Sequence, residues 1–422
     1  YQKNFKLAKS NNIAIKKSIG NYIMRLDADD WLDPFAVEIL VNVLKKNKKT
    51  DIVYPDYYLT DKDGDVVEVF SNKGKYLGTG HFQEGIISVR VFEFEQQEIT
   101  ATYWKNKLLQ AIKVRENLSL SSNEATNIYR LVHAEGDDLP GLIIDLYNTT
   151  AVIQCHSIGM WLLKDLFAKS LMETIPTLKA VYDKSTHSIP EKYHEPYAIK
   201  DDYIIGDAGS TTPALENNNL FSINWINGQK TGFFIDQREN RKLLGELSKG
   251  KKILNTFCYS GGFSIYALNN GAKEVHSLDS SQKAIDLLED NLKLIKDKAI
   301  NHTSIVADAM EFIKNIKDDY DIIILDPPAF AKHMKARHKA IQGYKRLNAR
   351  AIEQIKPGGI IFTFSCSQVM DKALFKNTIL SAAIAAQRKI KILHQLHQPA
   401  DHPINIFHPE SEYLKGLVLQ VF

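Results

Sequence analysis

Four side chains in the second half of the chain have the types and positions needed to bind a nucleoside and to supply a nucleophile. Asp279, Asp308 and Asp326 each follow a short apolar segment, and Cys366 follows another. If these segments are parallel strands of one sheet, their carboxyl ends lie at the edge where open α/β folds bind ligands. Carboxylates there can accept hydrogen bonds from ribose hydroxyls and a base amino group, and a thiolate can attack carbon.

A glycine turn precedes the first of these acids. An apolar segment at 252–257 runs into Gly261 and Gly262, and a helical pattern follows at 264–272. Glycine tolerates positive φ and lets a ligand lie against the backbone and the helix N-terminus. Asp279 comes roughly twenty residues after the turn, the offset at which an acidic residue binds ribose hydroxyls. The lack of a complete G-x-G-x-x-G disfavours a nicotinamide dinucleotide, and each acid taken singly could instead cap a helix.

The elements that must position these residues alternate between strand and helix from about residue 221 onward. This spacing is typical of a parallel sheet covered by helices. The strands that carry the candidate residues are predicted at 252–257, 273–278, 303–307, 320–325 and 358–365. We therefore predict a Rossmann-like α/β domain over 221–422, preceded by an α+β middle domain over 98–220 that opens with a helix at 102–117.

Length and composition are those of a multidomain protein without a membrane span. The chain has 422 residues, of which 44% are hydrophobic, and a net charge of +3, so an RNA partner would require a local basic face. No apolar run is long enough for a transmembrane helix and no signal-peptide pattern opens the chain, which predicts a cytoplasmic protein. The three cysteines are too few and too scattered for a disulfide framework or a thiolate metal site, and no metal is predicted for the 221–422 domain.

The order of the motifs from about residue 65 to residue 422 resembles that of ribosomal large-subunit RNA methyltransferases that form 5-methylcytosine. The shared motifs are EGDDLPGLIIDLY (135–147), GQKTGFFIDQR (228–238), LNTFCYSGGFS (254–264), LDPPAF (325–330), SCS around Cys366, and the closing segments at 401–403 and 413–417. The resemblance implies a class I methyltransferase fold, S-adenosylmethionine as methyl donor and large-subunit ribosomal RNA as substrate. A non-catalytic RNA-binding module with a degenerate cofactor pocket is a rival interpretation, which the intact acids and Cys366 disfavour.

The resemblance also assigns the cofactor contacts. It implies that the adenosine lies against Asp279 and Asp308, with the methionine end at the glycine turn and a further contact from Gln237 or Arg238. The full set of implied cofactor-binding residues is Gln237, Arg238, Phe257, Tyr259, Ser260, Gly261, Asp279, Ser280 and Asp308.

In such a methyltransferase, Cys366 and Asp326 would be the catalytic residues. C5 of cytosine is too weak a nucleophile to take a sulfonium methyl group directly, so a thiolate first adds to C6 and gives C5 enamine character. Cys366, directly after the strand at 358–365, fits that thiolate. Asp326 could hydrogen-bond N3 and stabilise the developing charge. Position alone leaves open that Cys366 is a small inert hydrophobe.

The remaining cysteines and the base that removes the C5 proton are assigned less directly. Cys258 lies in the glycine turn and is expected to line the methionine pocket, whereas Cys155, in a strand of the middle domain, is expected to be core. Pro328 stands where some RNA cytosine methyltransferases carry a second cysteine, so another group must take the C5 proton. Asp326 could serve in this step as well, and His402 is the weaker candidate, because a lone histidine before proline is more often a loop contact.

A basic run follows the Asp326 loop and could contact RNA phosphates. The run consists of Lys332, His333, Lys335, Arg337, His338, Lys339, Lys345 and Arg346. A solvated helix face would have the same composition, but the place of the run beside the candidate site favours RNA. The oligomeric state is not indicated by the sequence.

Residues 1–62 have a different character. A helix, a strand at 22–26 that ends in Asp27 and Asp29, and a second helix at 34–46 are predicted. The segment GNYIMRLDADDWLDP resembles the middle of a family 2 (GT-A) glycosyltransferase, in which Asp27 and Asp29 would hold a nucleotide-sugar through a divalent metal. A metal-dependent glycosyltransferase is therefore the main alternative function, although the carboxylates could equally form a solvated turn and a helix cap.

Residues 63–97 contain short β patterns separated by Gly and Asn turns. They resemble the closing strands of a PUA RNA-binding domain. Because the character of the chain changes near 61–65, we interpret the junction as a fusion of two gene fragments. The chain opens with Tyr1 inside an expected amphipathic helix, and we interpret it as a fragment of a longer protein.

Overall fold

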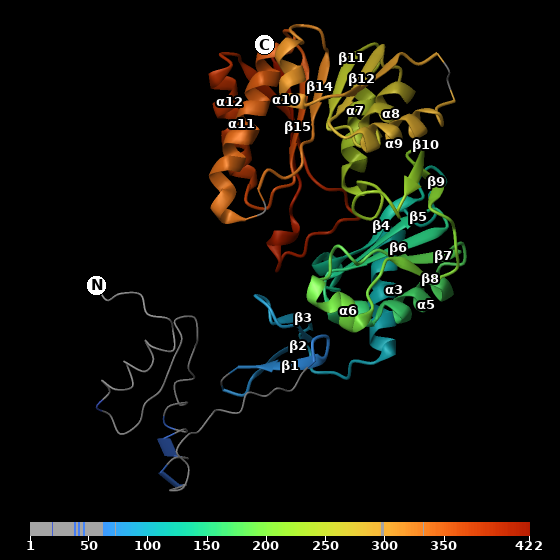
Figure 1. Ribbon diagram of the computed structural model, residues 1–422, viewed down its shortest axis with the longest axis vertical. Coiled ribbons are helices and arrows are strands. Elements are labelled where there is room, and N and C mark those ends of the chain that lie inside the picture. The colour runs from blue at the N-terminus through green and yellow to red at the C-terminus, as the bar shows by residue number, and fades with distance from the viewer. Residues whose placement is uncertain are drawn as a thin grey trace.

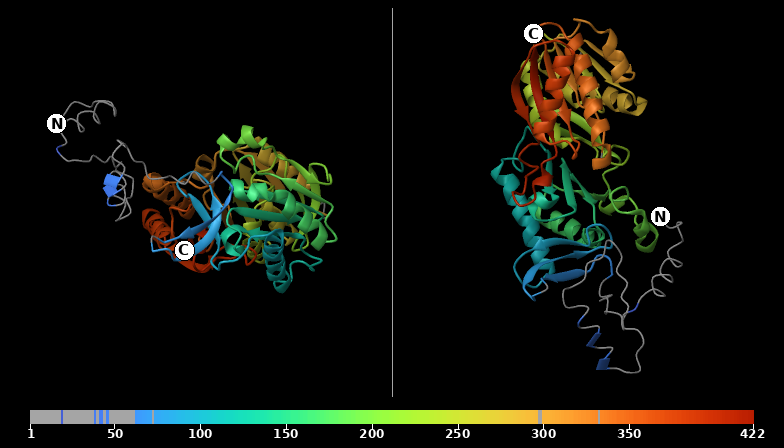
Figure 2. Two further views of the ribbon diagram at one scale, coloured as in Figure 1. Left: turned by 90° about the horizontal axis from the view of Figure 1, so that it is seen from below. Right: turned by 90° about the vertical axis from the view of Figure 1, so that its left-hand side faces the viewer.

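The computed structural model describes residues 62–71, 73–296, 299–331 and 333–422, with a few isolated positions before residue 62. The three larger of the four sheets among these residues follow one another along the long axis of the molecule, with the C-terminal sheet at one end and the three-stranded sheet nearest the other (Figures 1 and 2). The predicted helices and strand of the glycosyltransferase-like segment, including Asp27 and Asp29, lie outside the described residues.

The first sheet is a small antiparallel meander. Its strands are β1 (Val66–Phe70), β2 (Tyr76–Phe82) and β3 (Val89–Glu93), in the order β1-β2-β3. It packs on the long helix α3 (Ala101–Asn117), because the buried rings of His81 and Phe92 lie against Trp104, with ring centroids 5.4 and 4.6 Å away. The strands predicted for the PUA-like segment are thus present. The PUA assignment itself remains a prediction.

The second sheet has five strands in the order β4-β5-β6-β7-β8. Their bounds are β4 (Ile128–His133), β5 (Leu142–Tyr147), β6 (Thr150–Cys155), β7 (Ala180–Asp183) and β8 (Asp202–Ile205). Only the pair β6–β7 is parallel, since α4 (Ile158–Leu162) and α5 (Lys164–Thr174) cross between them. Cys155 is fully buried in this core, as predicted. A short helix α6 (His194–Tyr197) precedes β8.

A hairpin of β9 (Thr211–Glu216) and β10 (Asn219–Asn224) forms a separate two-stranded sheet. The domain boundary predicted at 220/221 therefore falls inside β10. The hairpin is tied to the C-terminal part by a buried ion pair, in which Arg241 of α7 (Arg238–Leu247) donates to Glu216 at 2.7 and 2.8 Å.

The third sheet has seven strands in the order β13-β12-β11-β14-β15-β17-β16. Their bounds are β11 (Lys252–Thr256), β12 (Glu274–Asp279), β13 (His302–Val306), β14 (Ile322–Leu325), β15 (Ile360–Ser365), β16 (Ile390–Leu396) and β17 (Lys415–Val421). The first five strands in this order are parallel, as predicted. The last two are antiparallel, because β17 returns between β15 and β16.

Helices cover both faces of this sheet. They are α7, α8 (Gly262–Asn269), α9 (Gln282–Leu292), α10 (Ala309–Phe312), α11 (Arg337–Gln354) and α12 (Lys372–Ala385). In β14, Ile322 and Ile324 belong to the core shared with α8, whereas Ile323 and Leu325 belong to the core shared with α11 and α12. A strand buried on both faces needs apolar residues at every position, which explains the unbroken run of apolar residues in β14. None of the helices among the described residues is long and apolar enough to cross a membrane.

Candidate active site

The turn between β11 and α8 has a constrained backbone. Phe257, Tyr259 and Gly261 all have positive φ, at 56°, 46° and 80°. A Cβ at Gly261 would collide with the side chain of Leu288, so only glycine fits there. The amide of Cys258 donates to Leu278 O at 3.1 Å and joins the turn to β12. Strained non-glycine conformations of this kind concentrate at ligand sites.

Asp279 ends β12 beside this turn, in a geometry that fits a nucleoside. Its two carboxylate oxygens accept from the amides of Tyr259 (3.1 Å) and Ser281 (2.9 Å), which orients a half-buried carboxylate at the carboxyl edge of the sheet. An oriented carboxylate next to a glycine turn is the hydrogen-bond acceptor that ribose hydroxyls require. Ser260 O accepts from the Asn291 side chain at 2.9 Å, and Ser280 is exposed.

Asp308, beyond β13, caps α10. Its exposed carboxylate accepts from the amide of Glu311 at 3.0 Å. The helix-cap alternative is therefore realised here. One oxygen of the carboxylate, Oδ1, makes the capping hydrogen bond. The contact of Asp308 with adenine remains a prediction.

Asp326 ends β14, and its carboxyl group is held by Gln237. The Gln237 amide donates to Asp326 Oδ2 at 3.0 Å and accepts from Asn240 at 2.6 Å. Burial raises the pKa of Asp326 to about 7 and the nearby Asp236 adds to the shift, against the hydrogen bond from Gln237. A carboxyl group with this pKa can donate a proton or accept one near neutrality.

The two side chains expected to add a cofactor contact are both engaged within the protein. Gln237 contacts Asp326, as described. The buried guanidinium of Arg238 donates to both oxygens of Asp401 at 2.8 and 3.0 Å and to Glu239 at 3.1 Å. The contacts seen for Arg238 are thus with the closing segment of the chain, and those of Gln237 position a predicted catalytic residue.

Cys366 follows β15, the strand next to β14, so it lies beside Asp326 at the same edge of the sheet. It is the one partly exposed cysteine, since Cys155 and Cys258 are both buried. Burial raises the pKa of the Cys366 thiol, the charge of Asp326 adds to this shift, and Lys230 opposes it. Burial also raises the pKa of the Cys258 thiol, in keeping with a cysteine packed against Ile285.

Two charged residues of the site were not singled out from the sequence. Lys230 Nζ lies 3.0 Å from Asp236 Oδ2 and 4.3 Å from the centroid of the Phe234 ring. Tyr413 Oη donates to the same Asp236 oxygen at 2.7 Å. Although burial would raise the pKa of Asp236, Lys230 and His402 together with the Tyr413 hydrogen bond hold it below its usual range. Lys230 and Asp236 both lie in the 228–238 motif, which was the signal available in the sequence.

His402, a candidate for the C5 base, is in a different environment. It is buried, its Nδ1 lies 3.2 Å from Asp401 Oδ1, and its ring centroid is 4.9 Å from that of His133 in the five-stranded sheet. Burial lowers the pKa of His402. Its neighbours therefore belong to the contact between the second and third sheets.

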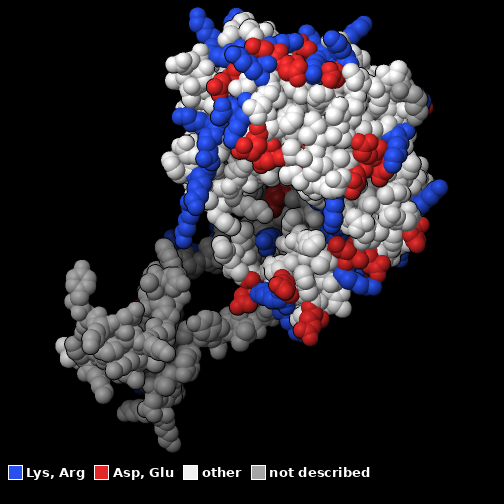
Figure 3. Space-filling view, turned by 45° about the horizontal axis from the view of Figure 1, so that its top comes forward, with Lys and Arg blue, Asp and Glu red and all other residues white. Residues whose placement is uncertain are grey.

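The basic run is placed on the outside of the third sheet. Lys332 lies outside the described residues, and Arg337 lies 3.6 Å from Asp371. The exposed members of the run are His333, Lys335, His338, Lys339 and Arg346. In the space-filling view, a column of lysine and arginine side chains runs down the side where α11 lies, next to a hollow in which acidic side chains are visible (Figure 3).

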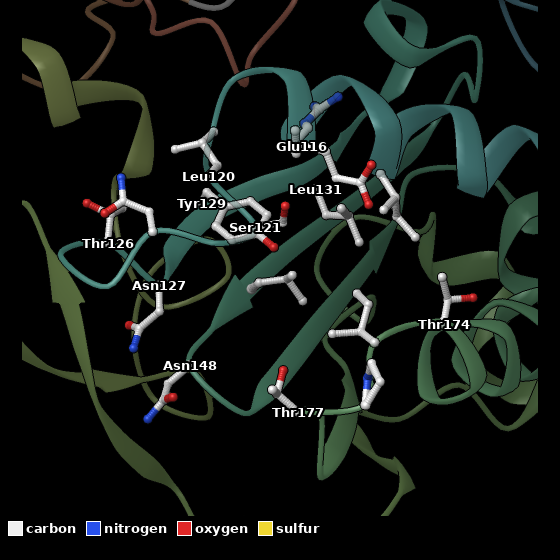
Figure 4. A pocket seen from close by; sticks show the side chains of 16 residues that line it. Glu116, Leu120, Ser121, Thr126, Asn127, Tyr129, Leu131, Asn148, Thr174 and Thr177 are labelled. Atoms are coloured by element: carbon white, nitrogen blue, oxygen red, sulfur yellow. The ribbon is translucent and has the colours of Figure 1, made fainter.

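A separate cavity of about 400 Å³ lies in the second sheet, between the end of α3 and strand β4. Tyr129, Asn148 and Thr177 are among the side chains around it (Figure 4). Its lining includes none of the predicted site residues. Among the described residues there is also no cluster of His, Cys, Asp and Glu arranged to hold a metal ion.

A seven-stranded sheet with a glycine turn, an oriented Asp279 and a Cys–Asp pair at its carboxyl edge defines a methyltransferase of the Rossmann-like class. The family model for S-adenosylmethionine-dependent methyltransferases matches residues 168–418. The chain belongs to this family, and S-adenosylmethionine is its cofactor.

Curated relatives extend the match over most of the chain. Ribosomal RNA large subunit methyltransferase I of Aeromonas hydrophila is 36% identical over 365 residues, which cover 85% of this chain and 91% of the relative. The protein of the same name from Aliivibrio fischeri is 35% identical over 364 residues, with the same coverage.

Solved structures agree in fold. A SAM-dependent methyltransferase from Streptococcus mutans has a TM-score of 0.73 at 24% identity, and the match covers 86% of this chain and 93% of that one. A methyltransferase complexed with SAH has a TM-score of 0.74 with the same identity and coverage. The model for glycosyl transferase family 2 also matches, over residues 2–94. That match extends into β1, β2 and β3, the strands assigned above to a PUA-like segment.

Proposed function

We propose that the protein methylates C5 of a cytosine in large-subunit ribosomal RNA. The named relatives, which are ribosomal RNA large subunit methyltransferases, support this substrate class. The observation that carries the C5 chemistry is the partly exposed Cys366 beside Asp326 at the carboxyl edge of the sheet. A ribosomal RNA substrate would place the reaction in the cytoplasm.

The chain's own residues would hold the cofactor and the base. S-adenosylmethionine supplies the methyl group when it is bound. Asp279 would accept from its ribose hydroxyls, and the backbone of the turn around Ser260 and Gly261 would lie against its amino-acid end. Ser280 and Asp308 remain candidates for further contacts with the adenosine.

Cys366 would act as a covalent catalyst. Its thiolate forms a bond to C6 of the cytosine, and the electron pair of the C5–C6 bond moves so that C5 becomes nucleophilic. Once C5 carries the methyl group, a base removes the C5 proton, the C5–C6 double bond is restored and the C–S bond breaks to release the thiolate. The product is 5-methylcytosine and the cysteine is regenerated.

Asp326 would serve the same base from the neighbouring strand. In its protonated form the carboxyl group donates a hydrogen bond to N3 and stabilises the charge that forms on the ring. In its ionised form it can take the C5 proton, and a pKa of about 7 leaves both forms populated. Gln237 keeps the carboxyl group in place through the bond at Oδ2.

The test is methylation of large-subunit ribosomal RNA by the full chain, with mass spectrometry of the nucleosides released by digestion. We expect 5-methylcytidine from the wild type. Cys366→Ala should abolish turnover while calorimetry finds unchanged affinity for S-adenosylmethionine, and the matched control Cys155→Ala should keep turnover. Activity retained by Cys366→Ala would point to a nitrogen or oxygen acceptor instead.

The match at residues 2–94 favours one other candidate, metal-dependent transfer from a nucleotide-sugar through Asp27 and Asp29. Removal of residues 1–61 separates the two functions. The truncated chain should still methylate RNA if the proposal is right. Manganese-dependent release of nucleotide from a nucleotide-sugar by the full chain, lost on truncation, would establish the second activity.

A further inference from the structure

Lys415 is a buried lysine next to the proposed catalytic cysteine. It begins β17 and pairs with Ser365, the residue before Cys366, across the antiparallel β15–β17 ladder. Its side chain is 4% exposed. Long lysine side chains are almost never buried to this degree without a partner for the charge.

The ammonium group of Lys415 is anchored on both sides of the cysteine loop. Its Nζ donates to Ser367 O at 2.8 Å and to Tyr413 O at 2.7 Å. Ser367 is the residue after Cys366, so main-chain contacts on both sides of the cysteine hold Lys415 close to it. Two of the three ammonium protons are used in these bonds, and one remains.

Neutral carbonyl groups do not balance the charge of a buried ammonium group. Among the residues that the structure describes, no carboxylate lies within 4.0 Å of Lys415 Nζ. The charged groups around it are Glu412, Asp371 and Lys372, of which Glu412 is paired with Lys372 and Asp371 lies 3.6 Å from Arg337. A buried cation of this kind requires an anion nearby.

The charges that face Cys366 are of both signs. Asp326 and Asp236 disfavour the thiolate, Lys230 favours it, and the Tyr344 hydroxyl also lies within electrostatic reach. Lys230 is 41% exposed and 3.0 Å from Asp236, so its charge is largely neutralised by that carboxylate. Among the described residues, Lys415 is therefore a cation near Cys366 whose charge no carboxylate within 4.0 Å balances.

We propose that the Lys415 ammonium group is the counter-ion of the Cys366 thiolate, and that Lys415 is a positioning residue which makes this thiol reactive. The role in methyl transfer rests on the proposed function, whereas the pairing of the two side chains does not. Burial lowers the pKa of Lys415 to about 8 and the charge of Cys366 opposes that shift. Because the Coulomb interaction is mutual, an ammonium group held this close to the cysteine favours the thiolate in turn.

The experiment measures the pH dependence of Cys366 alkylation by iodoacetamide, followed on the Cys366 peptide by mass spectrometry in the full chain. We expect Lys415→Met to slow alkylation at pH 7.5 by about tenfold, which corresponds to a rise of one unit in the thiol pKa. Lys415→Arg should restore most of the rate. The matched control Lys372→Met removes a neighbouring exposed lysine and should leave the profile unchanged.

A second measurement does not depend on the folding of Lys415→Met. In Cys366→Ala, the pH at which Lys415 becomes reactive toward acetic anhydride should fall relative to the wild type, since the anion that stabilises the ammonium group is gone. The pairing would be overturned if the alkylation profile were the same in Lys415→Met and wild type. It would also be overturned if Lys415 became reactive at the same pH in Cys366→Ala and wild type. Neither measurement uses RNA or methyl transfer, so both results can be interpreted even if the proposed function is wrong.

Discussion

Asp326 combines two properties that a carboxyl group rarely has together. One oxygen is fixed by the Gln237 amide, and burial with the charge of Asp236 raises its pKa to about 7. The fixed oxygen leaves the other free to face a base held next to Cys366. At the scale of single residues, the proposed chemistry thus depends on a carboxyl group that is partly protonated at neutral pH.

Asp326→Asn tests this role through its pH dependence. Because the folded-state pKa is raised, the protonated donor is present below pH 7 and is lost as the pH rises, so wild-type kcat/KM should lose activity above about pH 7. An asparagine amide donates at every pH. It cannot take up the C5 proton, so kcat/KM of the variant should be about 100-fold below that of the wild type at pH 7, and the variant should not show the wild type's loss of the donor above about pH 7.

Stability gives an independent reading of the same pKa. The folded state prefers the protonated carboxyl group, so the stabilising contribution is present at pH 4 and is lost as the pH rises through about 7. Urea unfolding at pH 8 should find Asp326→Asn more stable than the wild type. A variant that is equally stable at pH 5 and pH 8 relative to wild type would contradict the raised pKa.

At the scale of elements, the segment between β16 and β17 joins the second sheet to the third. Asp401 in this segment accepts from Arg238 of α7 and from the backbone amide of Arg130 in β4, at 3.0 Å. Its own carbonyl accepts from Arg115 of α3 at 2.8 Å. A single buried aspartate thus contacts an element on each side of the junction.

Asp401→Asn should weaken this junction. Removing one charge from a buried ion pair leaves the other uncompensated, which costs about 3–5 kcal/mol. The free energy of unfolding, measured with urea at pH 7, should fall by that amount. Asp371→Asn is the matched control, because its carboxylate is 64% exposed and 3.6 Å from Arg337, and it should cost about 0–1 kcal/mol. Equal losses in both variants would show that Asp401 does not join the sheets.

The pH dependence of stability at this junction has a definite sign. Burial by itself would raise the pKa of Asp401, but His402 and Arg238 hold this pKa below its usual range. Burial lowers the pKa of His402. Both groups therefore stabilise the protein at neutral pH, and their contributions are lost as the pH falls, first through the range of a free histidine and then through that of a free aspartate. The protein should accordingly unfold on acidification.

At the scale of the whole molecule, the exposed residues Lys335, Lys339 and Arg346, in and just before α11, belong to the face that would meet RNA phosphates. Figure 3 shows a column of lysine and arginine side chains down the side where α11 lies. A triple variant with Lys335, Lys339 and Arg346 replaced by glutamine should bind ribosomal RNA more weakly. The slope of log K against log salt should become shallower by about two, since each contact with single-stranded RNA contributes about 0.7. The same change to glutamine at Lys113, Lys169 and Lys179, all exposed in the part of the chain that forms the second sheet and its helices, should leave the slope unaltered.

Much of the third sheet could be predicted because its signals are local. The strands β11 to β15 and helix α8 nearly coincide with their predicted ranges, since an apolar run bounded by turn residues specifies a buried strand wherever it occurs. The antiparallel return of β17 and the hairpin that crosses the predicted boundary at 220/221 were not predicted. Strand direction and pairing depend on which segments meet in space, and no local pattern records that.

The same distinction applies to the site. The amino-acid sequence by itself determined which residues end the parallel strands, and so brought Asp279, Asp326 and Cys366 to one edge. Only the tertiary structure decided which polar and charged side chains meet in and around the site: Gln237 on Asp326, Lys415 beside Cys366, and Arg238 on Asp401. The physical reason is that hydrogen bonds and Coulomb forces act over distances in space, and partners such as Arg130 and Asp401 are 271 residues apart in the chain.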